Sequence, residues 1–286
     1  MKRKTVAVLI LIVSITSLAK AQESVFFFDT ALQAEVEFAL EIDHPPTTDD
    51  MLNLIFLDAK ELDIFDLTGL EKATNLFLLD LATNLIQDLS PIAGLEELRW
   101  LYLEENLIED ISPLSAMTKL ELLGLDNNEI TDISPLEEKQ SLTTLWLFNN
   151  YVTDISPIAD SGSLIELDLG YNLISDISTI AAFENLEELA LDGNTLNTPA
   201  YCSYLPQISI NNPTMTNENF LYDPNPNPIT NDCSTDVADL AGWTQNWLDI
   251  NCTSSNDFCN GADLDHVNNV DIKDFAHFAK LWLNEI

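Results

Sequence analysis

The chain repeats one pattern of hydrophobic and polar positions with a fixed period. Leucine or another apolar residue recurs at the same places in seven consecutive segments of 22 residues, which begin at Asn53, Asn75, Glu97, Lys119, Ser141, Ser163 and Asn185. A short, constant period is typical of a solenoid, in which stacked coils share one core. The pattern therefore predicts a repeat fold over 53–206, a class of fold that usually binds partners rather than catalyses reactions.

Each segment is expected to begin with a strand and to return through a turn. Alternation around Leu101 points the leucines inward and Trp100 and Tyr102 outward, as a half-buried strand requires. An asparagine then follows the strand, and its amide can satisfy backbone groups that the turn would otherwise bury unpaired, at Asn84, Asn106, Asn128, Asn150, Asn172 and Asn194. Ser112-Pro113 and its equivalents predict a serine N-cap with proline at the first helical position, so the coil should return through a short helical turn.

The repeats resemble the internalin-type leucine-rich repeat, because the sequence D-I-S-P recurs at 110–113, 132–135 and 154–157. The resemblance implies an α/β solenoid, a right-handed superhelix with parallel strands on the concave face and short 3₁₀ or helical turns on the convex face. Two repeats depart from the pattern: Leu62 replaces the asparagine in the first, and Thr179 replaces the proline in another.

The resemblance extends beyond the repeats in both directions. Phe28, Leu32, Val36 and Leu40 lie on one face of a predicted helix with Asp29 as a candidate N-cap, which looks like the helical amino-terminal cap of this family over 22–52. Downstream, 200–213 looks like the segment that closes such arrays.

The amino terminus has the layout of a secretory signal peptide. Lys2, Arg3 and Lys4 precede an apolar run over 6–13, and Ala19-Lys20-Ala21 supplies a cleavage site, so 1–21 is predicted to be removed. The apolar run is shorter than the roughly 20 residues that span a membrane. These features predict a secreted protein, extracellular or associated with a cell surface, that does not span the membrane.

The composition is strongly acidic. The formal net charge is -37, and removal of the four basic residues in the predicted signal peptide leaves 7 basic against 48 acidic residues, or -41. Nucleic acids and anionic lipid surfaces are poor partners, because both are bound by neutralisation with lysine and arginine. Cationic partners and metal ions stay open, and so does a role of the acidic residues in solubility alone.

The tail changes in character. A closing segment and Pro/Asn-rich linker are predicted over 207–231, followed over 232–286 by two similar amphipathic helices at 236–248 and 271–283. The second helix follows an EF-hand-like loop with candidate calcium ligands Asp263, Asp265, Asn269, Asp271 and Asp274. Val267 and Asn268 stand where this loop normally has an oxygen ligand and a glycine. We therefore predict at most one weak Ca²⁺ site, with a calcium-free helical pair as the alternative.

This tail resembles a small all-α dockerin domain. The resemblance implies a cohesin-like partner, through which the repeats would be attached as cargo to an extracellular, polysaccharide-processing assembly. Four cysteines, Cys202, Cys233, Cys252 and Cys259, allow three pairings, and export favours oxidation. We favour Cys202 with Cys233 and Cys252 with Cys259, over a zinc site that would lack suitable histidines.

The outward positions of the predicted strands supply a candidate ligand-binding surface. Aromatic residues should gather on the middle coils, with a dip at Gly124 and carboxylates beside them, in the set Phe56, Trp100, Tyr102, Asp126, Trp146, Phe148 and Asp168. Rigid aromatic rings with a polar rim suit a protein or a carbohydrate ligand. The alternative is that these rings only cover the sheet.

Little in the sequence points to an enzyme. There are three histidines, and no metal-hydrolase, nucleophile-elbow or phosphate-loop motif is present. A regular solenoid also offers no deep pocket in which one carboxyl pKa could be separated from its neighbour's. We predict a non-catalytic protein that binds a protein or glycan on the concave face. The alternative is a cargo or structural component attached through its tail.

Overall fold

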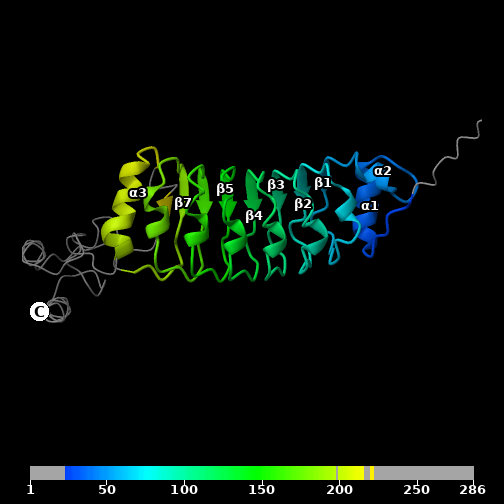
Figure 1. The fold of residues 1–286 in the computed structure, drawn as a ribbon. Coiled ribbons are helices and arrows are strands. Elements are labelled where there is room, and N and C mark those ends of the chain that lie inside the picture. The colour runs from blue at the N-terminus through cyan, green and yellow to red at the C-terminus, as the bar shows by residue number, and fades with distance from the viewer. Residues whose placement is uncertain (1–22, 198, 216–219, 222–286) are drawn as a thin grey trace, which may run out of the picture.

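A computed structural model of the protein describes residues 23–197, 199–215 and 220–221. They form one eight-stranded parallel sheet in which the strands follow the order of the sequence. The strands are β1 Phe56–Asp58, β2 Leu78–Asp80, β3 Trp100–Tyr102, β4 Leu122–Gly124, β5 Thr144–Trp146, β6 Glu166–Asp168, β7 Glu188–Ala190 and β8 Phe220–Leu221. Figure 1 shows them side by side along the molecule, between α1 and α2 at one end and α3 at the other.

The repeat period sets the register of this sheet. Leu57 pairs with Leu79 and Leu79 with Leu101, so equivalent residues of successive coils lie side by side. Leu101 and Leu103 are buried, whereas Trp100 between the coil's first two leucines is 39% exposed, as the alternation predicts. The return segments contain 3₁₀ turns, at Leu70–Lys72, Ser90–Ile92, Ser112–Leu114, Ser134–Leu136, Ser156–Ile158 and Ser178–Ala182. The predicted solenoid of parallel strands and short helical turns is confirmed.

The asparagine after each strand joins neighbouring coils. Asn128 Oδ1 accepts a hydrogen bond from Ile108 N at 3.0 Å, and its Nδ2 donates to Leu103 O at 2.9 Å and Leu125 O at 3.0 Å. Asn84, Asn106, Asn150 and Asn172 are buried in the same way. The predicted ladder is confirmed, and it explains how turns with no sheet partner can be buried.

The predicted serine N-cap is wrong. Ser112 begins its 3₁₀ turn, and its side chain makes no capping bond to the backbone. Instead Asp110, two residues earlier, accepts from Ser112 N at 2.7 Å and from Ser112 Oγ at 2.9 Å. The same aspartate-to-serine pairing recurs at Asp88 and Asp132. A carboxylate is a stronger acceptor than a hydroxyl, so the aspartate of D-I-S-P takes the capping role.

Helices cover both ends of the core. Helix α1, Thr30–Ala39, has Asp29 as its N-cap, as predicted, and buries Leu32 and Val36; the four-residue α2, Thr48–Met51, follows it. Phe28 does not join the buried face: it is 60% exposed and lies edge-on to Phe65, with ring centroids 5.9 Å apart.

The carboxyl-terminal end of the array is closed by helical structure and by one more strand. A π-helical turn, Ala200–Tyr204, leads into α3, Leu205–Asn211, which buries Leu205 and Ile208. Strand β8 then pairs with β7. The sequence did not reveal this last strand, because Phe220 and Leu221 lie outside the repeat.

Several predictions fall outside the described residues. They concern the signal peptide at 1–21, most of the linker, the tail at 232–286 with its calcium residues Asp263, Asp265, Asn269, Asp271 and Asp274, and the side chains of Cys202, Cys233, Cys252 and Cys259. In the part of the chain that the structure describes, no helix is long and apolar enough to cross a membrane.

Candidate functional site

The outward side chains of the strands, together with those of the second residue after each strand, form one continuous surface, here called the strand face. Because the register is constant, these side chains lie in three columns. The first column runs from Phe56 through Trp100 to Glu166 and Glu188. The second includes Tyr102, Trp146 and Asp168. The third consists of the second residue after each strand and includes Glu104, Asp126, Phe148 and Asp192. All seven residues predicted as ligand-binding lie on this face: Phe56, Trp100, Tyr102, Asp126, Trp146, Phe148 and Asp168.

The aromatic residues divide into three groups rather than one cluster. Trp100 packs against Phe77, which also contacts Phe56, with centroid separations of 5.7 and 5.9 Å. Tyr102 and Trp146 meet across β4 at 6.4 Å. Phe148 pairs with Tyr171 at 5.1 Å, beyond the carboxyl ends of the strands. Trp100 and Phe56 keep large exposed areas, so the face presents apolar surface to solvent.

The dip predicted at Gly124 is occupied by one neighbouring side chain, Glu104. A side-chain carbon at Gly124 would collide with the Glu104 carboxylate, which lies over this glycine. Glu104 Oε2 is buried and has no hydrogen-bond partner within the described residues. Burial raises the pKa of the Glu104 carboxyl, and the charges of Asp80 and Glu105 raise it further. Glycine at this position, between Tyr102 and Trp146 in the register, therefore leaves room for the Glu104 carboxylate.

Two more carboxylates on the face are also partly withdrawn from water. Asp126 Oδ1 accepts from Phe148 N at 2.8 Å, and Asp168 Oδ1 accepts from Gly170 N at 2.9 Å. Burial raises the pKa of Asp126 to about 7, helped by the charges of Asp168 and Glu104. Burial and the charge of Asp192 likewise raise the pKa of Asp168. The strand face thus holds carboxylates whose charge is poorly solvated.

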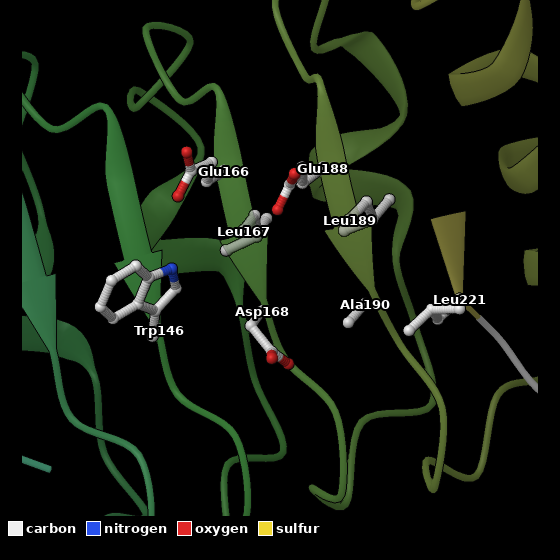
Figure 2. Close-up of a pocket in the computed structure, with 8 residues that line it drawn as sticks. All are labelled: Trp146, Glu166, Leu167, Asp168, Glu188, Leu189, Ala190 and Leu221. Carbon is white, nitrogen blue, oxygen red and sulfur yellow. The ribbon is translucent and has the colours of Figure 1, made fainter. Parts of the chain in front are cut away.

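A small pocket opens on the face between β5 and β8. Its volume is about 170 Å³, and its lining consists of Trp146, Glu166, Leu167, Asp168, Glu188, Leu189, Ala190 and Leu221. Figure 2 shows the carboxylates of Glu166 and Glu188 on neighbouring strands, with the indole of Trp146 to one side and Asp168 below them. The described residues contain no group of three or more His, Cys, Asp or Glu side chains suited to hold a metal ion.

Sequence reasoning missed several residues of this face. Phe77 lies one position before β2, and the predicted site included only positions within and after the strands. The equivalent residues of neighbouring coils, Ile55 and Arg99, are also not buried, so this column could have been identified as outward. Tyr171 has a φ of 52°, a left-handed conformation that is uncommon for an aromatic residue and carries no clear sequence signal. Glu166 and Glu188 were visible as outward residues, but only the register and the pocket show them together.

The repeats match models of known families. A model described as leucine-rich repeats in two copies matches 96–138 and 118–160, and a second leucine-rich-repeat model matches 140–196. No curated protein matches the chain.

Two solved structures from Listeria monocytogenes are similar to this one. An internalin, InlF, is 29% identical with a TM-score of 0.53, over 65% of this chain and 63% of that chain. Internalin C2 is also 29% identical, with a TM-score of 0.55, over 71% of this chain and 97% of that chain. The chain thus spans less than two thirds of the first of these relatives. The described residues form a leucine-rich-repeat solenoid that is similar in sequence and structure to internalins.

Proposed function

We propose that this protein is a secreted, non-catalytic binding protein that recognises a protein ligand on its strand face. The observation that carries the proposal is the aromatic set on that face, above all the exposed Trp100 and the half-buried Trp146 with its neighbouring pocket. Leucine-rich-repeat proteins generally act as protein-binding scaffolds. Tryptophan and tyrosine in a partly desolvated setting are the residues that most often dominate protein interfaces.

A protein ligand fits this face better than a carbohydrate does. A sugar that stacks on a platform needs an open, flat ring face. Here neighbouring rings are inclined to one another and do not form one flat platform: the planes of Phe77 and Trp100 lie at 63° and those of Tyr102 and Trp146 at 47°. The apolar and acidic surface continues over several coils, an extent that suits a polypeptide partner.

The test is a double substitution, Trp100→Ala with Trp146→Ala, in the full chain. The wild-type protein is used to capture a partner from the extracellular extract of its source, and the captured protein is identified, purified and titrated. We expect the double variant to lose binding at least about tenfold, because truncation of an aromatic anchor typically costs more than 1.4 kcal/mol.

A matched control removes exposed apolar surface away from the strand face. Tyr151→Ala with Leu173→Ala suits this purpose, since both side chains are exposed on the segments that follow the strands. Circular dichroism should be unchanged in both variants. Equal binding by wild type and the Trp100/Trp146 variant would refute the proposal.

A second role is proposed for the tail on its sequence alone. Asp263, Asp265, Asn269, Asp271 and Asp274 retain the spacing of an EF-hand-like loop, which supports attachment of the repeats to a cohesin-like partner through a calcium-dependent domain. Calcium titration of the full chain, with Asp263→Ala as the control variant, tests this role. Calcium-dependent folding that the substitution abolishes would support it, and an identical response of both proteins would refute it.

A further inference from the structure

The pocket beside Trp146 concentrates negative charge on neighbouring strands. Glu166 and Glu188 are direct partners in the register of β6 and β7. Like charges opposite one another on adjacent strands are destabilising. Asp168 adds a third carboxylate, partly buried and close to Asp192, and its pKa is raised by burial and by that neighbour. A cation in the pocket would offset the repulsion between Glu166 and Glu188, with Asp168 as a further negative charge in the same lining.

The described part of the chain supplies no such cation. The basic residues of the earlier coils form ion pairs with carboxylates of those coils: Lys60, Lys72, Arg99 and Lys119. Lys139 is buried and donates to the carbonyl oxygens of Ser115 and Pro135. The sequence then contains neither lysine nor arginine until Lys273. The negative charge of β6 and β7 therefore has no basic partner in the surrounding coils.

The shape and walls of the pocket suit one organic cation. Trp146 lies between Tyr102 on the β3 side and the pocket on the β6 side. An indole attracts a guanidinium or ammonium group over its ring, and the attraction grows when water is excluded. The volume of about 170 Å³ is well below the roughly 300–1,000 Å³ of ordinary small-molecule sites, so it matches a single side chain.

We infer that the ligand of the strand face is a basic polypeptide, with one arginine or lysine side chain seated between Trp146 and the carboxylates of Glu166, Asp168 and Glu188. This inference rests on the proposed function and specifies the chemistry of the partner. Charge complementarity continues outside the pocket, because Asp126 and Asp192 lie in the column that follows the strands. The excess of 48 acidic over 11 basic residues would also speed the encounter with such a partner.

The first experiment uses a defined probe with the full chain. The probe is a fluorescein-labelled glycine-serine peptide with several arginines, and its twin has citrulline at the same positions, which keeps the shape but removes the charge. Fluorescence anisotropy at physiological ionic strength gives both affinities. We expect the citrulline peptide to bind at least about tenfold more weakly. Equal affinities would overturn the inference.

The second experiment distinguishes the contribution of the pocket to peptide affinity from that of the protein's overall negative charge. Glu166→Gln, Asp168→Asn and Glu188→Gln together remove the pocket's charge and preserve side-chain shape. The matched variant Glu96→Gln, Glu109→Gln and Glu129→Gln changes the net charge equally at exposed positions elsewhere. We expect the pocket variant to lose affinity for the arginine peptide about tenfold or more, and the matched variant to lose about twofold at most. Equal losses in the two variants would show that only the overall field acts and would overturn the inference.

The natural partner, once captured, distinguishes failure of this inference from failure of the proposed function. If the Trp100/Trp146 variant loses the partner but the pocket variant does not, and arginine peptide does not compete, the strand face binds proteins by other chemistry and the inference falls. If neither variant affects capture, the proposed function itself fails. Loss of capture in both, with competition by the arginine peptide alone, supports the two together.

Discussion

Substitution of one ladder asparagine tests how the coils are held together. Asn128→Ala removes the hydrogen bond that Oδ1 accepts from Ile108 N and those of the two Nδ2 hydrogens, which are shared among Leu103 O, Leu125 O and Asp126 O at 2.9, 3.0 and 3.2 Å. The loss of these bonds does not cost the same for each backbone group, because the carbonyl oxygens of Leu103 and Leu125 have a second donor, whereas Ile108 N has no second acceptor among the described residues.

The carbonyl groups keep a partner after the substitution. Leu103 O still accepts from Asn106 Nδ2 at 3.1 Å, and Leu125 O from Asn150 Nδ2 at 2.9 Å. Ile108 N has no other acceptor among the described residues. An orphaned buried N–H costs about 1–3 kcal/mol, and each lost bond to a group that stays partnered costs less. We expect Asn128→Ala to lower the free energy of unfolding by about 3 kcal/mol.

Urea unfolding followed by circular dichroism measures this loss, with a corresponding fall of roughly 6–12 °C in the midpoint of thermal unfolding. The control is Asn75→Ala, in which an exposed asparagine loses one bond, from Nδ2 to Leu52 O at 2.8 Å. That variant should stay within about 0.5 kcal/mol of wild type. If Asn128→Ala is as mild as Asn75→Ala, the asparagines do not hold the coils together.

Asn128→Asp sharpens the test. Aspartate keeps an acceptor for Ile108 N but places a carboxylate against the oxygens of Leu103 and Leu125. At neutral pH it should therefore destabilise more than alanine does. Its pKa in the fold would be raised, because the protonated acid alone can donate, so stability should return as the pH falls through that pKa. A variant whose loss does not depend on pH would contradict this reasoning.

Two further predictions concern the strand face. The pKa of Asp126 is about 7 in the fold, above its ordinary value, so the folded state binds a proton more readily than the unfolded state does, and the free energy of unfolding should rise as the pH falls from 8 to 5. Urea titrations at each pH measure this rise. Asp126→Asn should reduce it more than the exposed control Asp160→Asn does. Gly124→Ala should lower the free energy of unfolding by under about 1 kcal/mol, because the flexible Glu104 carboxylate can move away, and should change the near-UV circular dichroism of the aromatic rings. Gly193→Ala should lower it by about 1–2 kcal/mol, because the φ of Gly193 is 69° and the Tyr171 ring lies 2.8 Å from the added carbon. Equal losses of stability in the two glycine variants would contradict the second prediction.

The repeat made most of the fold predictable. A single coil around Leu101 shows which residues face inward, and the constant period carries that assignment to β1–β7 without any knowledge of the sheet. The asparagine ladder follows from the same logic, since a buried turn needs a side chain that can both donate and accept. The helical cap was predictable from Asp29 and the spacing of Leu32 and Val36.

Other features depend on contacts that the sequence does not show. The position of Leu95 and Met117 in the core is occupied in a later coil by Lys139, which is buried. A lysine would be expected in water; it is tolerated because its Nζ donates to two carbonyl oxygens at 2.8 and 3.0 Å. The pairing of Asp110 with Ser112 was missed for a similar reason, because serine before proline is the more familiar cap.

The candidate site was predictable residue by residue but not as an arrangement. Alternation identified Trp146 and Asp168 as outward residues, and the columns contained Glu166 and Glu188 as well. Which rings meet depends on side-chain rotamers, so Tyr102 packs with Trp146 whereas Trp100 packs with Phe77. The poor solvation of Asp126 depends on burial by its neighbours, which no single sequence position indicates.

The solenoid separates the residues that stabilise the fold from those that face a partner. The inward apolar residues recur along the coils, and the ladder asparagine recurs in every coil after the first, so most interfaces between coils are stabilised in the same way. The strand face breaks this regularity. It places Glu166 beside Glu188 and buries one carboxylate oxygen of Glu104, Oε2, without a hydrogen-bond partner within the described residues. Local conflicts of this kind in an otherwise consistent sequence are expected at functional sites. Since a bound cation would offset the repulsion between Glu166 and Glu188, the residues that break the regularity of the sheet at the pocket are those that favour a basic partner.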